Sequence, residues 1–252
     1  MIGCAERHGI ECTVTEIPNG MVLNALSPKY RTGSPWADIP ERCGPYTTCY
    51  NRFVRWRKAG VWDQPFDAVS RAYDGDMQMI DSSSIRVHQH GANGKKGARR
   101  IPPPGREPDD RCMGRSRGGL TTKIHALVDA RGLPIALKLT PGQAHDGRSA
   151  AGMRDTLGGG DVLLADRAHD SDALRLEMAA RGAWANIKPM PGRKRRPPFS
   201  AFLYRYRNLV ECFFGKLKHF RAVATRFEKY SENYLALVKL ASAKIWMRFT
   251  SR

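Results

Sequence analysis

The segment TTKIHALVDARGLPIALKLTP, residues 121–141, contains two apolar runs separated by Ala130-Arg131-Gly132. Two short apolar runs around a glycine-containing turn predict a β-hairpin. Upstream, MQMIDSSSIRV at residues 77–87 predicts another strand, which small hydroxyl residues interrupt. Downstream, DVLLA at residues 161–165 and the stretch Trp184–Ile187 predict two short strands, the first of them buried.

Helical segments alternate with strands toward the C-terminus. We predict helices over the ranges 145–156, 171–181, 199–220 and 231–249. Asp170 or Ser171 would be the N-cap of the second, because a short polar side chain there accepts a hydrogen bond from the first turn. Three strands followed by alternating helices and strands indicate an α/β fold, a mixed sheet flanked by helices. The ribonuclease H-like fold has the same element order, but likeness of fold alone does not establish function.

The chain divides into three regions. Residues 1–20 show no clear period and form an atypical N-terminal segment. Residues 21–72 are expected to be a small helical region, and residues 76–249 form the α/β domain. That domain includes a flexible basic loop, 91–119, which is rich in Gly, Pro and Arg.

One helix of the N-terminal region is basic. The loop-like stretch 32–44 precedes a predicted helix over Tyr46–Val61, which carries Arg52 and Arg55. A basic helix behind a turn fits the second helix of a helix-turn-helix. It fits equally well a packed helix with an ordinary solvated face, and the sequence alone leaves both open.

The chain is strongly basic. It has 42 Lys and Arg against 24 Asp and Glu in 252 residues, a net charge of +18. Nucleic acid is the usual partner of such a surplus, because each neutralised phosphate releases a condensed counterion. Residues 193–229 alone hold 11 Lys or Arg and two acidic residues. At the start of this stretch, a run expected to grip the DNA backbone rather than read bases consists of Arg193, Lys194, Arg195 and Arg196.

Other patterns exclude several classes of protein. No apolar run approaches the roughly 18 residues of a membrane span, and the N-terminus lacks a signal-peptide pattern. The six cysteines have no CxxC or zinc-ribbon spacing, so we expect free thiols. His88 and His90 form an H-x-H pair, a weak metal motif without a second Cys or His pair nearby. We expect a cytoplasmic, nucleoid-associated protein.

Three acidic residues lie where they would suit a metal site. Asp81 follows the apolar run MQMI, Asp166 follows DVLLA, and Glu211 lies in the basic C-terminal stretch. Carboxylate oxygens are the ligands that Mg²⁺ prefers, and a metal relieves the repulsion between converging carboxylates. Each acid also has another explanation. Asp81 could end a strand, Asp166 could cap the next helix, and Asp170 or Asp172 could replace Asp166 in the site.

Glu211 belongs to a polar stripe. At about 100° per residue along an α-helix, Tyr204, Arg207, Glu211 and Lys218 fall within about 60° of one another. A phenol, a guanidinium, a carboxylate and an ammonium on one stripe suit a surface that ligates a metal and holds neighbouring phosphates. The alternative is a salt-bridge stripe within the helix, because Arg207 and Glu211 are four residues apart.

These residues carry a family resemblance. The spacing Tyr204-(2)-Arg207-(3)-Glu211-(6)-Lys218 resembles the signature of DDE transposases of the insertion-sequence four superfamily. Over residues 21–249 the chain is similar to the insertion-sequence five branch. The stretches that carry the likeness, in order, are RTGSPWADIPERCGPYTTCYNRFVRWRKAGVW (Arg31–Trp62), MIDSSSIRVHQH (Met79–His90), GRSRGGLTTKIHALVDARGLPIALKLTPGQAHD (Gly114–Asp146), LLADRAHDSD (Leu163–Asp172) and YRYRNLVECFFGKLKHFRAVATRFEKY (Tyr204–Tyr230).

The resemblance implies a fold and residue roles. The implied fold is ribonuclease H-like, with a helical N-terminal DNA-binding region. The catalytic carboxylates, which would bind two Mg²⁺ or Mn²⁺ ions, would be Asp81, Asp166 and Glu211. The residues beside them that hold the DNA backbone would be Tyr204, Arg207 and Lys218.

The resemblance also implies a reaction. A phosphodiester is hydrolysed at each end of the mobile element, and the freed 3′-hydroxyl attacks target DNA. Both steps are in-line displacements at phosphorus, which one two-metal site can serve. No covalent protein–DNA intermediate is needed, so Tyr204 is expected to contact DNA and not to attack it. The implied partners are double-stranded DNA and a second copy of the chain, as a homodimer on DNA.

The chain departs from the family pattern in two places. Residues 1–20 do not resemble the additional helix and longer basic segment that precede the RTG-x-PW motif, and Pro28 falls where a helix would run. His169 stands where the family has tyrosine, which should leave the metal site intact. A decayed transposase that binds DNA without cutting is one alternative, and a nuclease or Holliday-junction resolvase is another. Metal-dependent cleavage and inverted repeats flanking the gene would discriminate among the three.

Overall fold

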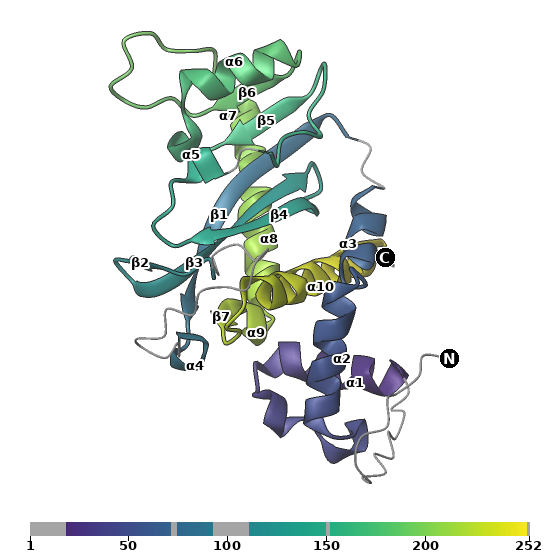
Figure 1. The fold of residues 1–252 in the computed structure, drawn as a ribbon. Helices are drawn as coiled ribbons and strands as arrows, with labels where there is room; N and C mark the ends of the chain where they lie inside the picture. The colour runs from purple at the N-terminus through teal and green to yellow at the C-terminus, as the bar shows by residue number, and fades with distance from the viewer. Residues whose placement is uncertain (1–18, 72–74, 93–110, 150–151, 251–252) are drawn as a thin grey trace, which may run out of the picture.

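The computed structural model describes residues 19–71, 75–92, 111–149 and 152–250. Within these ranges, seven strands form one mixed sheet with helices on both faces (Figure 1). The strands are β1 (Met77–Val87), β2 (Gly114–Ser116), β3 (Gly119–Asp129), β4 (Pro134–Pro141), β5 (Val162–Ala165), β6 (Trp184–Ile187) and β7 (Thr225–Arg226). The helices and 3₁₀ turns are α1 (Asn19–Thr32), η1 (Trp36–Asp38), η2 (Glu41–Cys43), α2 (Tyr46–Lys58), α3 (Asp63–Ser70), α4 (Gln89–Ala92), α5 (Asp146–Ser149), η3 (Arg167–His169), α6 (Asp172–Ala180), α7 (Ala201–Tyr204), η4 (Arg205–Arg207), α8 (Asn208–Lys218), α9 (Arg221–Ala224) and α10 (Ser231–Thr250).

The hairpin predicted over 121–141 is confirmed as β3 and β4, which pair antiparallel. Strand β1 lies next to it, antiparallel to β3, and its other edge pairs parallel with β5. Strand β6 continues the sheet parallel to β5. The sheet order is β2-β3-β1-β5-β6, with β4 also on β3 and β7 also on β1. Strand β1, which has 11 residues like β3, is therefore central and joins the antiparallel half to the parallel half.

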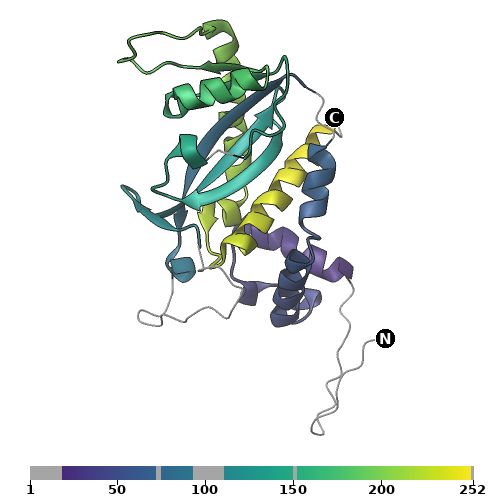
Figure 2. The ribbon, with the colours of Figure 1, turned by 45° about the horizontal axis from the view of Figure 1, so that its top comes forward.

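The two faces of the sheet bury separate cores. Met79 and Ile85 of β1 pack in one core with residues of α8 and α10, whereas Ile80 packs in another with Leu174 and Met178 of α6. Figures 1 and 2 show α8 and α10 on one side of the sheet and α6 on the other. Because successive strand residues point to opposite faces, Asp81, two residues after Met79, faces α8.

The N-terminal helices α1, α2 and α3 share a core with the C-terminal helices. A buried cluster combines Leu26, Phe53 and Trp62 with α9 and α10 residues Ala222, Ala236 and Leu237. Two ion pairs join the same elements, Arg57 Nη1–Glu232 Oε2 at 2.9 Å and Lys239 Nζ–Asp63 Oδ1 at 2.6 Å. Figure 2 shows α3 lying alongside the C-terminal part of α10.

Pro28 does not interrupt α1, contrary to expectation. Proline removes one backbone donor and clashes with the preceding turn, so it normally ends or kinks a helix. Here Ala25 and Leu26, in the turn before it, are 0% and 1% exposed. Burial of this turn against the rest of the protein favours the helix over the local penalty.

Other predicted elements differ in extent. The helix expected over 199–220 is divided into α7, the 3₁₀ turn η4 and α8. Of the helix expected over 145–156, the described residues form the four-residue α5 and a turn at 152–156. Strand β2 lies inside the predicted loop 91–119, of which residues 93–110 are outside the described ranges, as are residues 1–18. Ser171, and not Asp170, is the N-cap of α6, and its side chain accepts a hydrogen bond from Leu174 N at 3.2 Å.

Three smaller expectations concern cysteines, histidines and membrane spans. Within the described ranges, Cys43, Cys49, Cys112 and Cys212 are free thiols. The rings of His88 and His90 contact edge to face, at 4.7 Å between centroids, and no metal-binding group of His, Cys, Asp or Glu includes them among the described residues. None of the helices in the described part of the chain has the length and apolar character needed to cross a bilayer.

Candidate active site

Asp81 and Asp166 lie side by side because of the register between β1 and β5. These parallel strands pair Met77 with Val162 and Met79 with Leu164. Two residues further along each strand are Asp81 and Asp166, on the face that α8 covers. The charge of Asp166 contributes to raising the pKa of Asp81, as a neighbouring like charge does.

Asp81 is held by two hydrogen bonds. Its Oδ1 accepts one from Ser82 N at 2.8 Å, and its Oδ2 accepts one from Arg207 Nη2 at 2.7 Å. Its side chain is only 16% exposed. Burial raises its pKa above the ordinary value, and the positive charge of Arg207 opposes this shift without cancelling it. The site thus holds an acidic group whose charge the protein does not fully compensate.

Asp166 is fixed by the turn that follows β5. Its Oδ1 accepts hydrogen bonds from Ala168 N at 3.0 Å and from His169 Nδ1 at 2.9 Å, so it caps η3. The bond from His169 is the main cause that lowers the pKa of Asp166. The capping interpretation of Asp166 is therefore confirmed for the turn η3, and its position beside Asp81 leaves its role in a metal site as a prediction. His169, whose ring is 1% exposed, is a supporting residue to which the sequence assigned no role.

The competing acids have other roles. Asp170 is fully buried and accepts hydrogen bonds from Arg175 and Arg193. Asp172 lies at the first turn of α6 and pairs with the other side of Arg193. Neither carboxylate joins Asp81.

Arg207 connects Glu211 to the strands. Its Nη1 donates to Glu211 Oε1 at 2.6 Å, while Nη2 donates to Asp81. The Arg207 side chain is 15% exposed and that of Glu211 is 55% exposed. The salt bridge four residues along the helix therefore exists, but it extends across to the sheet.

The 3₁₀ turn η4 sets the position of the stripe. In a 3₁₀ helix, side chains three residues apart eclipse, which aligns Tyr204 with Arg207. Tyr204 is half-buried, and burial raises the pKa of its phenol, an effect that the charges of Asp166 and Asp81 reinforce. Lys188, at the end of β6, has its Nζ 5.7 Å from the centre of the Tyr204 ring. No sequence pattern indicated Lys188, because only the sheet order brings it here.

The remaining predicted residues lie farther out. Lys218 is exposed at the end of α8, two turns beyond Glu211. Lys194, Arg195 and Arg196 are exposed in the loop after β6, whereas Arg193 donates to Asp170 Oδ2 at 2.6 Å.

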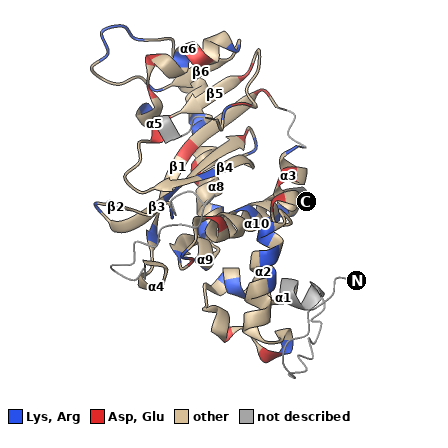
Figure 3. Ribbon diagram, in the orientation of Figure 1, with Lys and Arg blue, Asp and Glu red and all other residues tan. Residues whose placement is uncertain are grey.

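Arg52 and Arg55 lie on α2, the first half-buried and the second exposed. Figure 3 shows basic segments along α2, at a distance from the acidic band on β1. The fold thus brings together Tyr204, Arg207, Asp81, Asp166 and Glu211, but not the basic residues of α2.

The three carboxylates fit a hard divalent cation by their chemistry. Oxygen donors and close like charges favour such an ion. Within the described ranges, no group of three His, Cys, Asp or Glu lies close enough to ligate one metal. The Arg207 guanidinium lies between Asp81 and Glu211 and bonds to both. A cation shared by these two residues would therefore compete with Arg207 for their oxygens.

A second polar cluster lies on the opposite face of β1. Asp146 Oδ1 accepts hydrogen bonds from Ser82 Oγ at 2.8 Å and Lys123 Nζ at 3.0 Å. His125 is fully buried, and its Nε2 shares a hydrogen bond with Thr140 Oγ1 at 2.8 Å. Its Nδ1 has no hydrogen-bond partner among the described residues and lies 4.0 Å from Asp146 Oδ1. Burial lowers the pKa of His125 to about 4. This cluster anchors the strand directly behind Asp81.

Comparison with known proteins gives a consistent result. A family described as Transposase DDE domain matches residues 73–245, which include all three carboxylates, and one described as Putative transposase of IS4/5 family matches residues 6–66. A putative transposase for insertion sequence element IS6501 from Brucella ovis is 43% identical over 130 residues, 51% of this chain and 100% of that protein. A putative transposase for insertion sequence element IS402 from Burkholderia cepacia is 32% identical over 155 residues, 57% of this chain and 68% of that protein. Among solved structures, a pre-cleavage Mos1 transpososome aligns over 98% of this chain and 81% of that chain, with a TM-score of 0.27 and 11% identity.

Proposed function

Because the chain belongs to the DDE transposases of the IS5-like group, we propose that Asp81, Asp166 and Glu211 are the carboxylates with which it cuts and joins DNA. It is the transposase of an insertion sequence. The observation that carries the residue assignment is the shared face: β1, β5 and α8 direct one acid each to the same side of the sheet, and Arg207 bonds two of them.

Membership of the DDE domain family implies use of a divalent metal. We propose that two Mg²⁺ or Mn²⁺ ions bind to Asp81, Asp166 and Glu211. When bound, such ions activate the attacking oxygen and neutralise charge on the leaving oxygen.

The chain's other residues orient this site. His169 and Ala168 N fix the Asp166 carboxylate, and Ser82 N fixes that of Asp81. Arg207 keeps a positive charge beside both Asp81 and Glu211. It thereby limits repulsion between carboxylates until DNA and metal are in place.

A DNA backbone beside the carboxylates would meet several cations and a phenol. We propose that Tyr204, Arg207 and Lys218 hold the reacting strand, and that Lys188 adds charge behind Tyr204. Beyond them, Lys194, Arg195 and Arg196 are placed to hold flanking phosphates. Arg193 contributes less there, because Asp170 and Asp172 already engage its guanidinium.

The sheet order supports the proposed fold of the catalytic domain. The order in which β3, β1, β5 and β6 lie, with β4 antiparallel beside β3, is that expected of a ribonuclease H-like catalytic domain. We propose that residues 21–72 are the helical DNA-binding region, with Arg55 and the half-buried Arg52 facing DNA.

We also propose a homodimer on DNA, because two element ends must be brought together. Light scattering with and without end DNA would test this stoichiometry.

The experiment that tests the function is cleavage and strand transfer by purified protein. The substrate is the gene with its own flanking DNA, incubated with Mg²⁺ or Mn²⁺. We expect metal-dependent cuts at two defined ends and joining of the 3′-ends to target DNA. Glu211→Gln should bind the same DNA and not cut it. Normal cutting by Glu211→Gln would remove Glu211 from the site, and binding without cutting by the unsubstituted chain would favour a decayed transposase.

A further inference from the structure

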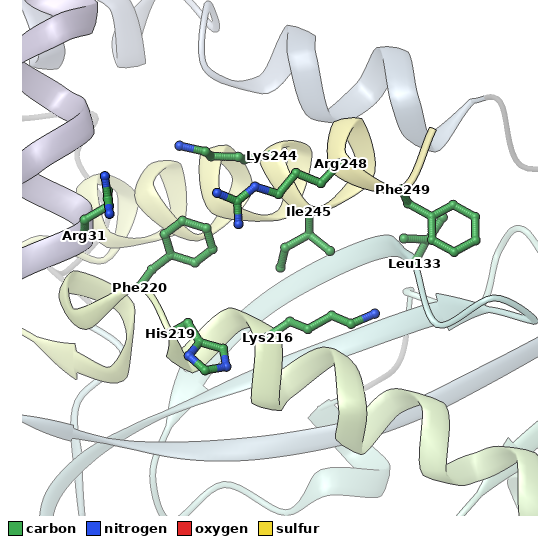
Figure 4. A pocket seen from close by; sticks show the side chains of 9 residues that line it. All are labelled: Arg31, Leu133, Lys216, His219, Phe220, Lys244, Ile245, Arg248 and Phe249. Atoms are coloured by element: carbon green, nitrogen blue, oxygen red, sulfur yellow. The ribbon is translucent and has the colours of Figure 1, made fainter. Parts of the chain in front are cut away.

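A basic cleft lies between α1, α8 and α10, separate from the carboxylates. Its volume is about 780 Å³. Its cationic lining comes from Arg31 of α1, Lys216 of α8, and Lys244 and Arg248 of α10, as Figure 4 shows. Lys216 is five residues after Glu211, so at about 100° per residue it lies about 140° around α8 from the catalytic stripe. The helix therefore carries the carboxylate on one side and the cleft on another.

Three of the four cations that line this cleft lack an acidic partner among the described residues. Its lining, within the described residues, includes no Asp or Glu. In the described part of the chain, Arg31, Lys216 and Lys244 take part in no salt bridge. By contrast, Arg57 of α2 is paired with Glu232, and Lys239 of α10 is paired with Asp63. Grouped like charges repel one another, so the cleft favours an anionic ligand that neutralises several of them at once.

The floor of the cleft is apolar and its rim is basic. Phe220, Ile245 and Leu133 line the floor, and His219 lies beside Lys216 at the mouth (Figure 4). A strand of nucleic acid presents both features, since phosphates alternate with less polar sugars and bases. Cations from three separate helices suit a chain of phosphates better than one compact ion, because they surround the opening instead of converging on a point.

We propose that this cleft binds the phosphodiester backbone of DNA at a distance from the bond being cut, so that the enzyme holds its DNA on two sides of α8. The proposal rests on the proposed function only in that DNA is the substrate. It assigns to Arg31, Lys216 and Lys244 a binding role that does not involve the carboxylates.

The test is DNA binding by Lys216→Gln/Lys244→Gln at a series of KCl concentrations, in EDTA so that no cutting occurs. The slope of log K against log[salt] is negative, and each lost phosphate contact reduces its magnitude by about 0.9. Loss of two contacts should reduce the magnitude of the slope by about 1.8. With equal affinities at 1 M salt, the variant should bind DNA about 60-fold more weakly than the unsubstituted chain at 0.1 M salt. The matched control is Arg115→Gln/Arg117→Gln, which removes two exposed charges at the β2–β3 turn.

The outcomes separate this inference from the catalytic one. We expect Lys216→Gln/Lys244→Gln to bind DNA more weakly and with a smaller dependence on salt. The variant should keep the unfolding midpoint of the unsubstituted chain and should cut at a normal rate when DNA is saturating. An unchanged salt slope, or an equal loss in the control, would overturn the inference. So would a variant that loses self-association but keeps its DNA affinity, because the occupant would then be a second copy. Failure of Glu211→Gln to abolish cutting would instead overturn the catalytic assignment and leave the cleft untouched.

Discussion

Replacing Arg207 by glutamine is expected to destabilise the protein through Asp81 far more than through Glu211. The two carboxylates lie at similar distances from the guanidinium, 2.7 and 2.6 Å. Their surroundings differ, because the side chain of Asp81 is 16% exposed and that of Glu211 is 55% exposed. Solvent can replace the lost partner of Glu211 but not that of Asp81.

The expected size follows from this difference. At an effective dielectric constant near 20, unit charges about 4 Å apart attract by about 4 kcal/mol, and removing one partner of a buried pair costs about 3–5 kcal/mol. Because Asp81 is not fully buried, we expect Arg207→Gln to lower the free energy of unfolding by about 3 kcal/mol. The exposed pair with Glu211, four residues along a helix, should account for about 0.5 kcal/mol of that.

The measurement is a pair of double-mutant cycles in urea at pH 7 with EDTA. One cycle combines Arg207→Gln with Asp81→Asn and the other combines it with Glu211→Gln. Asp81→Asn alone should cost little, because burial already disfavours the charge of Asp81 by raising its pKa. The coupling free energy should be about 2–3 kcal/mol with Asp81 and under about 1 kcal/mol with Glu211.

The pair Arg57–Glu232 provides a control cycle. It has the same kind of geometry, 2.9 Å with the acid 60% exposed, and lies away from the carboxylates. Its coupling should match that of Arg207 with Glu211. Equal couplings of Arg207 to Asp81 and Glu211, or a value below about 0.5 kcal/mol for Asp81, would refute the argument from burial.

Three other predictions concern supporting residues. His125 has a pKa of about 4 in the folded protein against an ordinary 6.5, so stability should fall as pH drops from 6.5 through 4, by about 3 kcal/mol; His125→Gln should flatten that part of the curve in urea titrations, and an unchanged slope would contradict this. His169→Ala removes the 2.9 Å hydrogen bond to Asp166, and its removal should raise the pKa of that carboxyl. The Mg²⁺ concentration needed for cleavage should then rise about 10- to 100-fold, whereas the affinity for DNA should not change. Arg193→Ala should lower the free energy of unfolding by about 1–2 kcal/mol, because it removes one partner of the fully buried Asp170 side chain. A change no larger than that of Lys194→Ala would show that the pair is dispensable.

Local sequence patterns were sufficient for most of the sheet. Short apolar runs between turns predict the hairpin at 121–141 and the strands at 162–165 and 184–187. At these places the tertiary structure agrees with the local preference. Pro28 shows the opposite case, because the penalty it carries is local while the burial of Ala25 and Leu26 depends on distant residues. Periodicity also failed to predict the 3₁₀ turn within 199–220. A 3₁₀ turn differs from an α-helical turn by only about 20° per residue, which is too little to change the apolar pattern.

Only those residues of the candidate site could be predicted whose type is unusual at their place in the sequence. Acids after apolar strands and a polar stripe on a helix are visible in the sequence. Lys188 and His169 are not, because a lysine at the end of a strand and a histidine in a turn have many ordinary roles. Only the parallel pairing of β5 with β6 and the turn η3 place them beside Tyr204 and Asp166.

The stripe on the helix shows why two explanations of one pattern need not exclude each other. The spacing of Arg207 and Glu211 permits an ordinary salt bridge, and that bridge is present. The same guanidinium also reaches Asp81, from which 126 residues of chain separate it. Since Asp81 retains a raised pKa even with this partner, the arginine compensates its charge incompletely. A divalent cation would supply the remaining positive charge, so the salt bridge is compatible with the proposed role of Asp81 and Glu211 as metal ligands.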